Sequence, residues 1–160
     1  NKSAGGWASS QEAIYEIYKK HLNVAKDCGT GQGCFPNGPY KTYRHDNSYT
    51  DWNINARDNE YKIVLTDGIS VSFAGFSEDN DNCTITSWGS NNICAGIRVD
   101  INGVKKPNTV GKDLFVFVIK KNGLYPAGCD LKLCDLNNIS TDAYGMGCAC
   151  KVLREGAMNY

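Results

Sequence analysis

Apolar residues recur at helical spacing close to the start of the chain. Ser9 and Glu12 have the spacing of a capping box, in which a hydroxyl and a carboxylate satisfy free backbone N–H groups at a helix start. The apolar positions that follow come every three or four residues, as they do along one face of an amphipathic helix. These positions are Ala13, Ile14, Ile17, Tyr18, His21, Leu22 and Ala25. The pattern predicts one helix over Ser9–Ala25, within a helical segment placed at residues 9–26.

A long stretch without steady periodicity runs from Cys28 to Glu60. It is rich in Gly, Asn, Asp and Tyr. Loops of this length are unusual inside compact domains, and they are often functional or held in place by cross-links. We therefore expect an irregular loop between helix and sheet over residues 27–60, pinned near its start by Cys28 and Cys34.

From Tyr61 onward, alternating or continuous apolar runs predict strands. The turn compositions Asp67-Gly68 and Gly89-Ser90-Asn91-Asn92 separate two pairs of these runs. Leu114–Ile119 is almost wholly apolar, which predicts a central strand buried on both faces. The expected strands are Tyr61–Thr66, Ile69–Phe73, Cys83–Trp88, Ile93–Ile101, Leu114–Ile119 and Gly145–Arg154.

A helix followed by a run of strands is typical of an α+β fold rather than an alternating α/β one. The chain has 160 residues, which suits one domain. We expect residues 1–160 to form a single unit in which the amphipathic helix packs on an antiparallel sheet. The expected contacts join Ile14, Ile17 and Tyr18 to Ile63, Leu65, Val71, Phe115 and Phe117.

Charge and hydropathy narrow the function classes. The chain carries 17 basic and 17 acidic residues, whereas nucleic-acid binders carry a basic excess that neutralises phosphates. No apolar run is long enough to span a bilayer. We therefore expect no nucleic-acid partner, and membrane contact only through a segment that is absent from this sequence.

Eight cysteines indicate disulfides and an oxidising compartment. Zinc is a poor fit, because the chain has no CxxC pair and only two histidines. The expected pairs are Cys28–Cys34 and Cys83–Cys94. Cys148 and Cys150 are expected on one face of a strand, where they could bind Cys129 and Cys134 in either combination. A redox-active or metal-binding Cys148-x-Cys150 has no cationic activator nearby beyond Lys151.

The stretch VDINGVKKPN, residues 99–108, has two interpretations. Asn-Gly is the preferred pair for a type I′ hairpin turn, because both residues tolerate positive φ. The same region offers hard oxygen ligands at short spacing, as calcium prefers. The candidate calcium ligands are Asp100, Asn102, Asn108 and Asp113. Val104 and Lys105 stand where a calcium loop usually gathers acidic residues, so the hairpin is favoured.

No motif for catalysis or for an organic cofactor occurs, and we expect no enzyme activity. His21 lies on the helix stripe, and His45 stands beside Asp46 and near Ser48, although adjacent residues rarely face each other.

The loop Tyr40–Tyr61 combines Tyr and Trp with Asn, Asp, Arg57 and His45. That composition is typical of a sugar- or surface-binding face, where aromatic rings supply area and polar groups supply direction. Packing of a long loop onto the sheet explains the same aromatic residues and is favoured.

The pattern DINGxKxPNxxGxDxFxF resembles a motif of bacterial type IV pilins and type II secretion pseudopilins. Its matching positions are Asp100, Ile101, Asn102, Gly103, Lys105, Pro107, Asn108, Gly111, Asp113, Phe115 and Phe117. Four further patches resemble the same family in the same order: QEAIYEIYKKHLNVAKDC, LTDGISVSF, NGLYPAGC and GCACKVLREGAMNY.

The resemblance implies a globular head whose N-terminal anchor helix, left by a prepilin peptidase, is missing from this sequence. It implies a structural subunit of a type IV pilus (fimbrium) or pseudopilus that serves adhesion, motility, uptake or secretion. Its partners would be other pilin subunits and a host or environmental surface. It would reside in the inner membrane before assembly and in an extracellular filament afterwards. The alternative is a secreted disulfide-rich module that binds carbohydrate or protein.

Overall fold

The computed structural model describes residues 11–42, 52–75, 83–129, 134 and 145–158. Its elements are α1 (Gln11–Lys19), β1 (Val24–Gly29), the 3-10 turn η2 (Ile54–Ala56), β2 (Tyr61–Leu65), β3 (Ser70–Gly75), β4 (Ile85–Ser87), β5 (Ser90–Ile93), β6 (Ala95–Asp100), β7 (Leu114–Lys120), β8 (Gly123–Pro126) and α2 (Cys148–Glu155).

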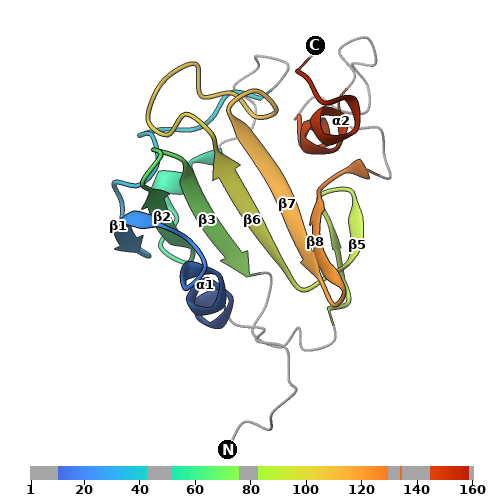
Figure 1. Cartoon of the computed structure of the whole chain (residues 1–160), viewed down its shortest axis with the longest axis horizontal. Helices are drawn as coiled ribbons and strands as arrows, with labels where there is room; N and C mark the ends of the chain where they lie inside the picture. The colour runs from blue at the N-terminus through green and yellow to red at the C-terminus, as the bar shows by residue number, and fades with distance from the viewer. Residues whose placement is uncertain (1–10, 43–51, 76–82, 130–133, 135–144, 159–160) are drawn as a thin grey trace, which may run out of the picture.

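One antiparallel sheet dominates the molecule (Figure 1). Its six strands lie in the order β1-β2-β3-β6-β7-β8, and β4 and β5 form a separate two-stranded sheet. β3 and β6 occupy the middle and pair over six residues, from Ser70↔Asp100 to Gly75↔Ala95. In the sequence, the hairpin β4–β5 is therefore an insertion between β3 and β6, which are neighbours in the sheet.

The sheet has a different core on each face, because side chains of a strand alternate between its faces. Cys34, Phe35, Tyr40, Trp52 and Ile54 lie on one face and pack with Leu114, Val116 and Val118 of β7; we call this the loop-side core. The other face carries Ile63, Val71, Phe73 and Ile97 together with residues of α1, and we call it the helix-side core. The prediction that the β7 run is buried on both faces is confirmed, although the strand lies next to the edge strand β8.

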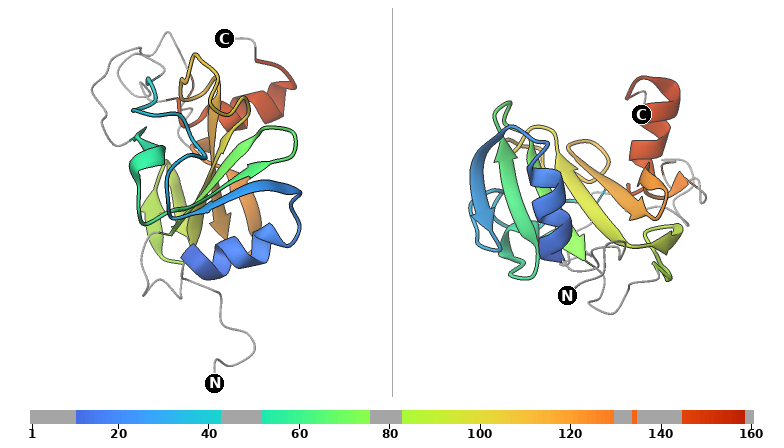
Figure 2. Two further views of the ribbon diagram at one scale, coloured as in Figure 1. Left: turned by 90° about the vertical axis from the view of Figure 1, so that its left-hand side faces the viewer. Right: turned by 60° about the horizontal axis from the view of Figure 1, so that its bottom comes forward.

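The predicted α+β fold, with a helix from 9 to 26 lying across the sheet, is wrong. The described helix α1 has nine residues and ends at Lys19. Val24–Gly29 is strand β1 at the sheet edge, paired antiparallel with β2 (Figure 2). Asn23 and Val24 are weak helix formers, and the pairing of β1 with β2 satisfies backbone groups that a longer helix would otherwise have paired internally. The fold is a mostly β domain with two short helices.

The predicted helix contacts are partly wrong. Ile14 packs with Ile63 and Val71 in the helix-side core. Ile17 instead has 51% of its surface exposed. Phe115 faces a third, smaller cluster with Cys134, Cys148 and Ala149. Ser9 of the expected capping box lies outside the described residues.

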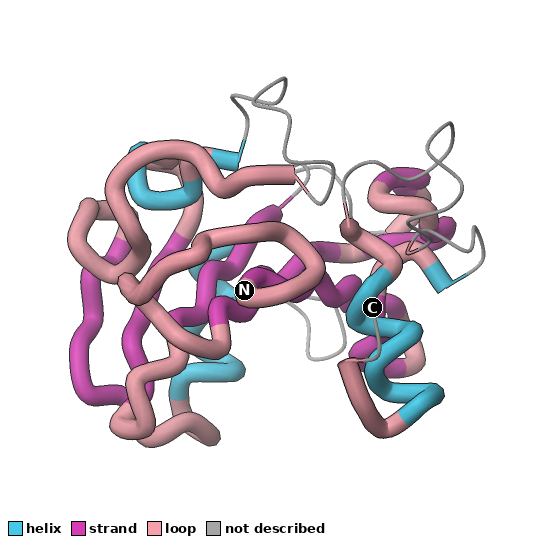
Figure 3. The backbone as a smooth tube through the Cα atoms, turned by 90° about the horizontal axis from the view of Figure 1, so that it is seen from above, coloured by secondary structure: helices cyan, strands magenta, loops and turns pink. Residues whose placement is uncertain are grey.

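The predicted strand Gly145–Arg154 is also wrong, because Cys148–Glu155 forms the helix α2. Cys148, Ala149 and Val152 contact Phe115 and Phe117, a helical spacing that is hard to recognise in so short a run. Gly156 ends the helix in the left-handed conformation, with φ 68°, and its N–H donates to Val152 O at 2.8 Å. α2 packs near β7, at the opposite end of the sheet from β1 (Figure 3).

All eight cysteines form disulfides. The expected pairs Cys28–Cys34 and Cys83–Cys94 are confirmed. The alternative left open is resolved as Cys129–Cys150 and Cys134–Cys148. Residues two apart on a helix point in nearly opposite directions, about 200° apart, so Cys148 and Cys150 do not share a face and reach different partners. Four disulfides are typical of a protein that folds in an oxidising, extracellular or secreted environment.

Among the residues that the structure describes, no helix combines the length and the apolar character needed to cross a membrane.

Replacing both cysteines of one pair by alanine should destabilise the fold in proportion to the loop that the pair closes. Cys134–Cys148 spans 14 residues and Cys28–Cys34 spans six, so we expect losses of about 3 and about 2 kcal/mol. Urea unfolding of the two double variants measures both values. A larger loss for the shorter loop would contradict a chain-entropy origin.

Candidate functional site

The loop-side face of the central strands is polar where a sheet face is usually apolar. Ser70, Ser72, Arg98 and Asp100 are buried on the central strands, and Lys62 is buried on β2. Their spacing of two places them on one face of the sheet. Buried polar groups require partners, and here the partners come largely from the covering loop.

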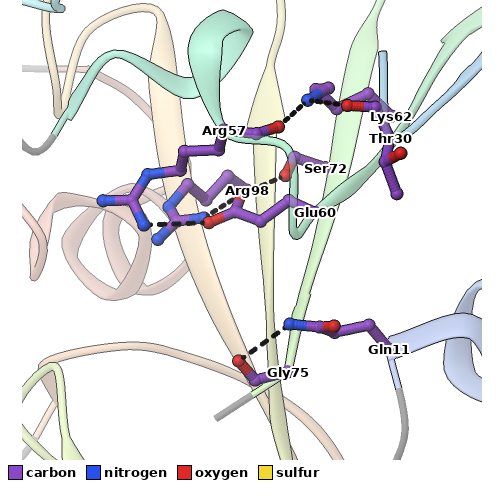
Figure 4. Close-up of polar contacts among 8 residues, drawn as sticks. All are labelled: Gln11, Thr30, Arg57, Glu60, Lys62, Ser72, Gly75 and Arg98. Atoms are coloured by element: carbon purple, nitrogen blue, oxygen red, sulfur yellow. Dashed lines mark hydrogen bonds and ion pairs between the residues drawn. The ribbon is translucent and has the colours of Figure 1, made fainter.

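Glu60, Arg98 and Arg57 form an ion-pair cluster between the loop and β6 (Figure 4). Glu60 Oε2 accepts hydrogen bonds from Arg98 Nη1 and from Ser72 Oγ, the latter at 2.6 Å. Arg57 Nη1 lies 3.2 Å from Glu60 Oε1. The side chains of Glu60 and Arg98 are only 3% and 5% exposed. Burial lowers the pKa of Arg98, and the charge of Glu60 opposes that effect.

Lys62 attaches the same loop to the sheet a second time. Its ammonium donates to Thr30 O at 3.1 Å and to Arg57 O (Figure 4). Burial lowers its pKa, partly offset by the charges of Glu60 and Asp58. The Lys62 ammonium on β2 therefore binds both ends of the loop, at Thr30 and at Arg57.

Two tryptophans enclose the buried guanidinium of Arg98. The guanidinium carbon, Arg98 Cζ, lies 4.8 Å from the ring centroid of Trp88 and 5.6 Å from that of Trp52. Both distances are within the range of cation–π attraction. A side chain at Gly96 would prevent this arrangement, because a Cβ there would lie 2.0 Å from Trp88 Cζ3. The Trp88 ring thus lies directly on the backbone of β6.

Trp88 adopts an unusual backbone conformation for a bulky residue. It has φ 47° and Gly89 has φ 64°, and together they connect β4 to β5. The left-handed region costs a side-chain-bearing residue about 1–2 kcal/mol, and Asn normally fills this turn position. The expected turn at 89–92 is thus displaced to Trp88-Gly89, which directs the indole over β6.

A pocket of about 420 Å³ opens beside this cluster. It is lined by Trp52, Arg57, Asn59, Glu60, Ala74, Gly75, Ser87, Trp88, Arg98 and Met146. Trp52 Nε1 and Arg98 Nε are buried donors with no acceptor among the described residues. Pockets of about 300–1,000 Å³ with a few placed polar groups are typical of small-molecule sites. We call this cavity the tryptophan–arginine pocket.

The candidate calcium ligands lie together in the connection between β6 and β7. Asp100 Oδ1 accepts from Asn102 N at 3.0 Å, and Asp113 Oδ1 accepts from Asn102 Nδ2 at 2.9 Å. Asp100 Oδ2 accepts from the Tyr40 hydroxyl, and Asp113 Oδ2 accepts from Thr109 N at 2.9 Å. Each carboxylate oxygen therefore has at least one protein donor, and the Gly103 N–H is a further donor to Asp100.

The charge of this cluster is poorly balanced. The pKa of Asp100 is raised to about 6, chiefly because the carboxyl is buried and further because Asp113 repels its charge. The Oδ1 atoms of Asn102 and Asn108 are buried without a donor among the described residues. A bound cation would relieve both features, although no group of three or more His, Cys, Asp or Glu suited to a metal occurs in the described ranges. Calcium stays a prediction.

The other residues singled out from the sequence have separate fates. His21 is exposed beyond the end of α1. His45, Asp46 and Ser48 lie outside the described residues. Cys148 and Cys150 are both in disulfides with different partners, which leaves no free Cys148-x-Cys150 dithiol.

The residues considered as a binding face in the loop 40–61 lie in two separate parts of the structure. Tyr40 is buried against Asp100, whereas Trp52 and Arg57 reach the pocket. Sequence reasoning missed Trp88 and Arg98. The signal for Arg98 was present, because a charged residue flanked by Ile97 and Val99 must find a partner when its strand is interior.

Comparisons with known proteins found no family model, no curated protein and no solved structure that matches this chain.

Replacing Glu60 by Gln should destabilise the protein by about 3–5 kcal/mol, because it leaves the buried Arg98 guanidinium without its counter-charge. Glu16→Gln is the matched control, since Glu16 is an exposed carboxylate on α1 and should shift stability by no more than about 0.5 kcal/mol. Denaturant unfolding measures both. Equal stability of the two variants would show that the ion pair does not hold the loop.

Calcium binding between β6 and β7 is tested by thermal unfolding with calcium and with a chelator. Binding at the predicted ligands raises the midpoint as calcium exceeds its dissociation constant. The rise should disappear in Asp113→Asn and persist in Glu16→Gln, which changes an exposed carboxylate on α1. A midpoint that calcium does not move in the unmodified protein would exclude the site.

Proposed function

We propose that this chain is the globular part of a subunit of an extracellular filament of the type IV pilus or pseudopilus kind. The proposal concerns assembly and location, and it does not require the long helix that β1 replaces. The observation that carries it is the exposed apolar side of α1.

Apolar residues occupy two sides of α1. Ile14 and Tyr15 are buried in the helix-side core, and Tyr15 stacks on Tyr61 with ring centroids 4.6 Å apart. Ile17, one turn on from Ile14, has 51% of its surface exposed. Covering this exposed isoleucine with a second apolar surface would lower the free energy, because apolar area would be removed from water. Repeated head-to-tail contacts of that kind generate open helical filaments.

The motif residues that carry the resemblance have definite structural roles. Gly103, Asn108 and Gly111 all have positive φ, between 55° and 86°, a region that Gly and Asn tolerate best. Asp100 and Asp113 hold the connection through the hydrogen bonds described above. The resemblance thus rests on residue types that this backbone requires, which supports a relationship over a chance match of letters.

The four disulfides support an extracellular location. A subunit outside the cell that opened could not be refolded by cytosolic chaperones, and cross-links lower the population of opened states. Cys129–Cys150 and Cys134–Cys148 tie the last helix to the segment after β8. A filament under tension would benefit from that attachment.

Ile17→Glu in the full-length protein should abolish filament assembly while the isolated domain keeps its stability within about 0.5 kcal/mol, because the side chain is exposed. Leu153→Glu is the matched control, since Leu153 is a 64% exposed apolar residue on α2. Electron microscopy of surface filaments and domain unfolding give the two readouts. Normal filaments with Ile17→Glu would contradict a role of this surface in assembly.

The sequence that precedes Asn1 in the full-length protein gives a second test. A filament subunit of this kind should carry an apolar segment of about 20 residues with a Glu near its start, preceded by Gly and a short basic leader. A cleaved signal peptide followed directly by this domain would favour the alternative, a secreted binding module. The tryptophan–arginine pocket is the observation that favours that alternative.

A further inference from the structure

The tryptophan–arginine pocket has more donors than its own acceptors can satisfy. Among the described residues that line it, Glu60 is the one carboxylate, and it faces both Arg57 and Arg98. Trp52 Nε1–H and Arg98 Nε–H find no acceptor in the described part of the chain. The described lining therefore carries a net positive charge and an excess of N–H groups. A complementary ligand brings oxygen acceptors and negative charge.

The walls of the pocket supply apolar faces as well. Trp88, Trp52 and Met146 line it, and the Trp88 ring packs against the backbone at Gly96. A flat aromatic wall favours a ligand with a matching apolar face, and polar groups such as Asn59 and Ser87 then set its orientation. A simple inorganic anion would use the arginines but not these walls.

The conformation of Trp88 argues against a purely structural role. The turn holds it at φ 47°, where Asn or Gly would be relaxed. Strained backbone of this kind concentrates at binding sites, because the surrounding structure must keep it in place. Asn at position 88 would suit the turn better, so the indole has a reason to be there other than forming the hairpin.

We propose that the tryptophan–arginine pocket binds an acidic saccharide, a pyranose ring that carries a carboxylate. The carboxylate pairs with the half-buried Arg57, ring oxygens and hydroxyls accept from the unpartnered donors, and the apolar ring face lies against Trp88. The site is separate from the assembly surface around Ile17, so it adds ligand recognition to either candidate function.

The test is a chemical-shift titration of the oxidised chain with a trisaccharide of galacturonic acid, and with the neutral trisaccharide of galactose. Saturable binding of the acidic sugar is expected, at least about tenfold tighter than that of the neutral one, because one charge-assisted contact is lost in the latter. Shifts should concentrate at Trp88, Arg98 and Arg57.

Three variants and one matched control locate the site. Trp88→Asn suits the turn but removes the ring that packs on Gly96 and Arg98, so its unfolding midpoint is measured first, and in the folded variant binding should weaken by about tenfold or more. Arg57→Gln should weaken binding by about tenfold, whereas Arg154→Gln on the exposed side of α2 should leave it unchanged. Gly96→Ala should weaken binding by displacing the Trp88 ring.

Three outcomes would overturn the proposal. They are the absence of saturable binding by the acidic trisaccharide, equal affinity for the neutral one, and binding that persists unchanged in both Trp88→Asn and Arg57→Gln. An acidic peptide that binds while the acidic trisaccharide does not would assign the pocket to a protein ligand and also refute it.

Discussion

The buried ion pair between Glu60 and Arg98 is the constraint on which the arrangement of the loop depends. Removing a guanidinium from water is costly unless a counter-charge and hydrogen bonds meet it, and Arg98 is 4% exposed in the middle of β6. Its partner comes from the end of the long loop, 38 positions earlier. Burial of Arg98 in β6 and closure of the loop over the sheet are therefore coupled. Trp52 and Arg57 are placed by the same closure, so the pocket is a consequence of how the ion pair is satisfied.

The two faces of the sheet differ in role: the helix-side face forms an apolar core, and the loop-side face carries the polar groups of the candidate site. The helix-side core is made of residues such as Ile63, Val71 and Phe73, which are fully apolar and need no directed partners. The loop-side face between β3 and β6 has serines and charged groups at the equivalent positions. A polar face costs stability unless every group is paired. Trp52 Nε1, Arg98 Nε and Ser70 Oγ have no partner among the described residues and mark where pairing is incomplete. That incompleteness gives the face its capacity for a ligand.

Strands β2, β3, β6 and β7 could be predicted from the sequence because apolar runs or a period of two survive in stretches such as Ile69–Phe73, whereas β1, β5 and β8 were missed. The Cys83–Cys94 pair followed from neighbouring strands. The end of the helix at Lys19 could not be predicted, because the apolar spacing through Leu22 and Ala25 fits a continuing helix. The strand partner of Val24, Leu65 on β2, lies 41 positions further along the chain. α2 was missed because its eight residues hold barely two turns. The loop 40–61 was recognised as a candidate binding face, but the pocket also needs Trp88 and Arg98, which only tertiary contacts bring to it.

The pocket walls are constrained before any ligand arrives, which bears on how it could discriminate. Trp88 lies in a hairpin whose two ends are joined by Cys83–Cys94, and the loop that carries Trp52 and Arg57 is held by Lys62 and by the Glu60–Arg98 pair. The loss of side-chain and loop freedom is a major cost of binding. Here the side chains and the loop are already ordered in the folded protein, so binding causes little further loss. A preformed site also adapts poorly to a wrong ligand, because its strained tryptophan cannot move without breaking the hairpin turn. Rigidity of this origin favours selection by charge and ring shape over tolerance of many partners.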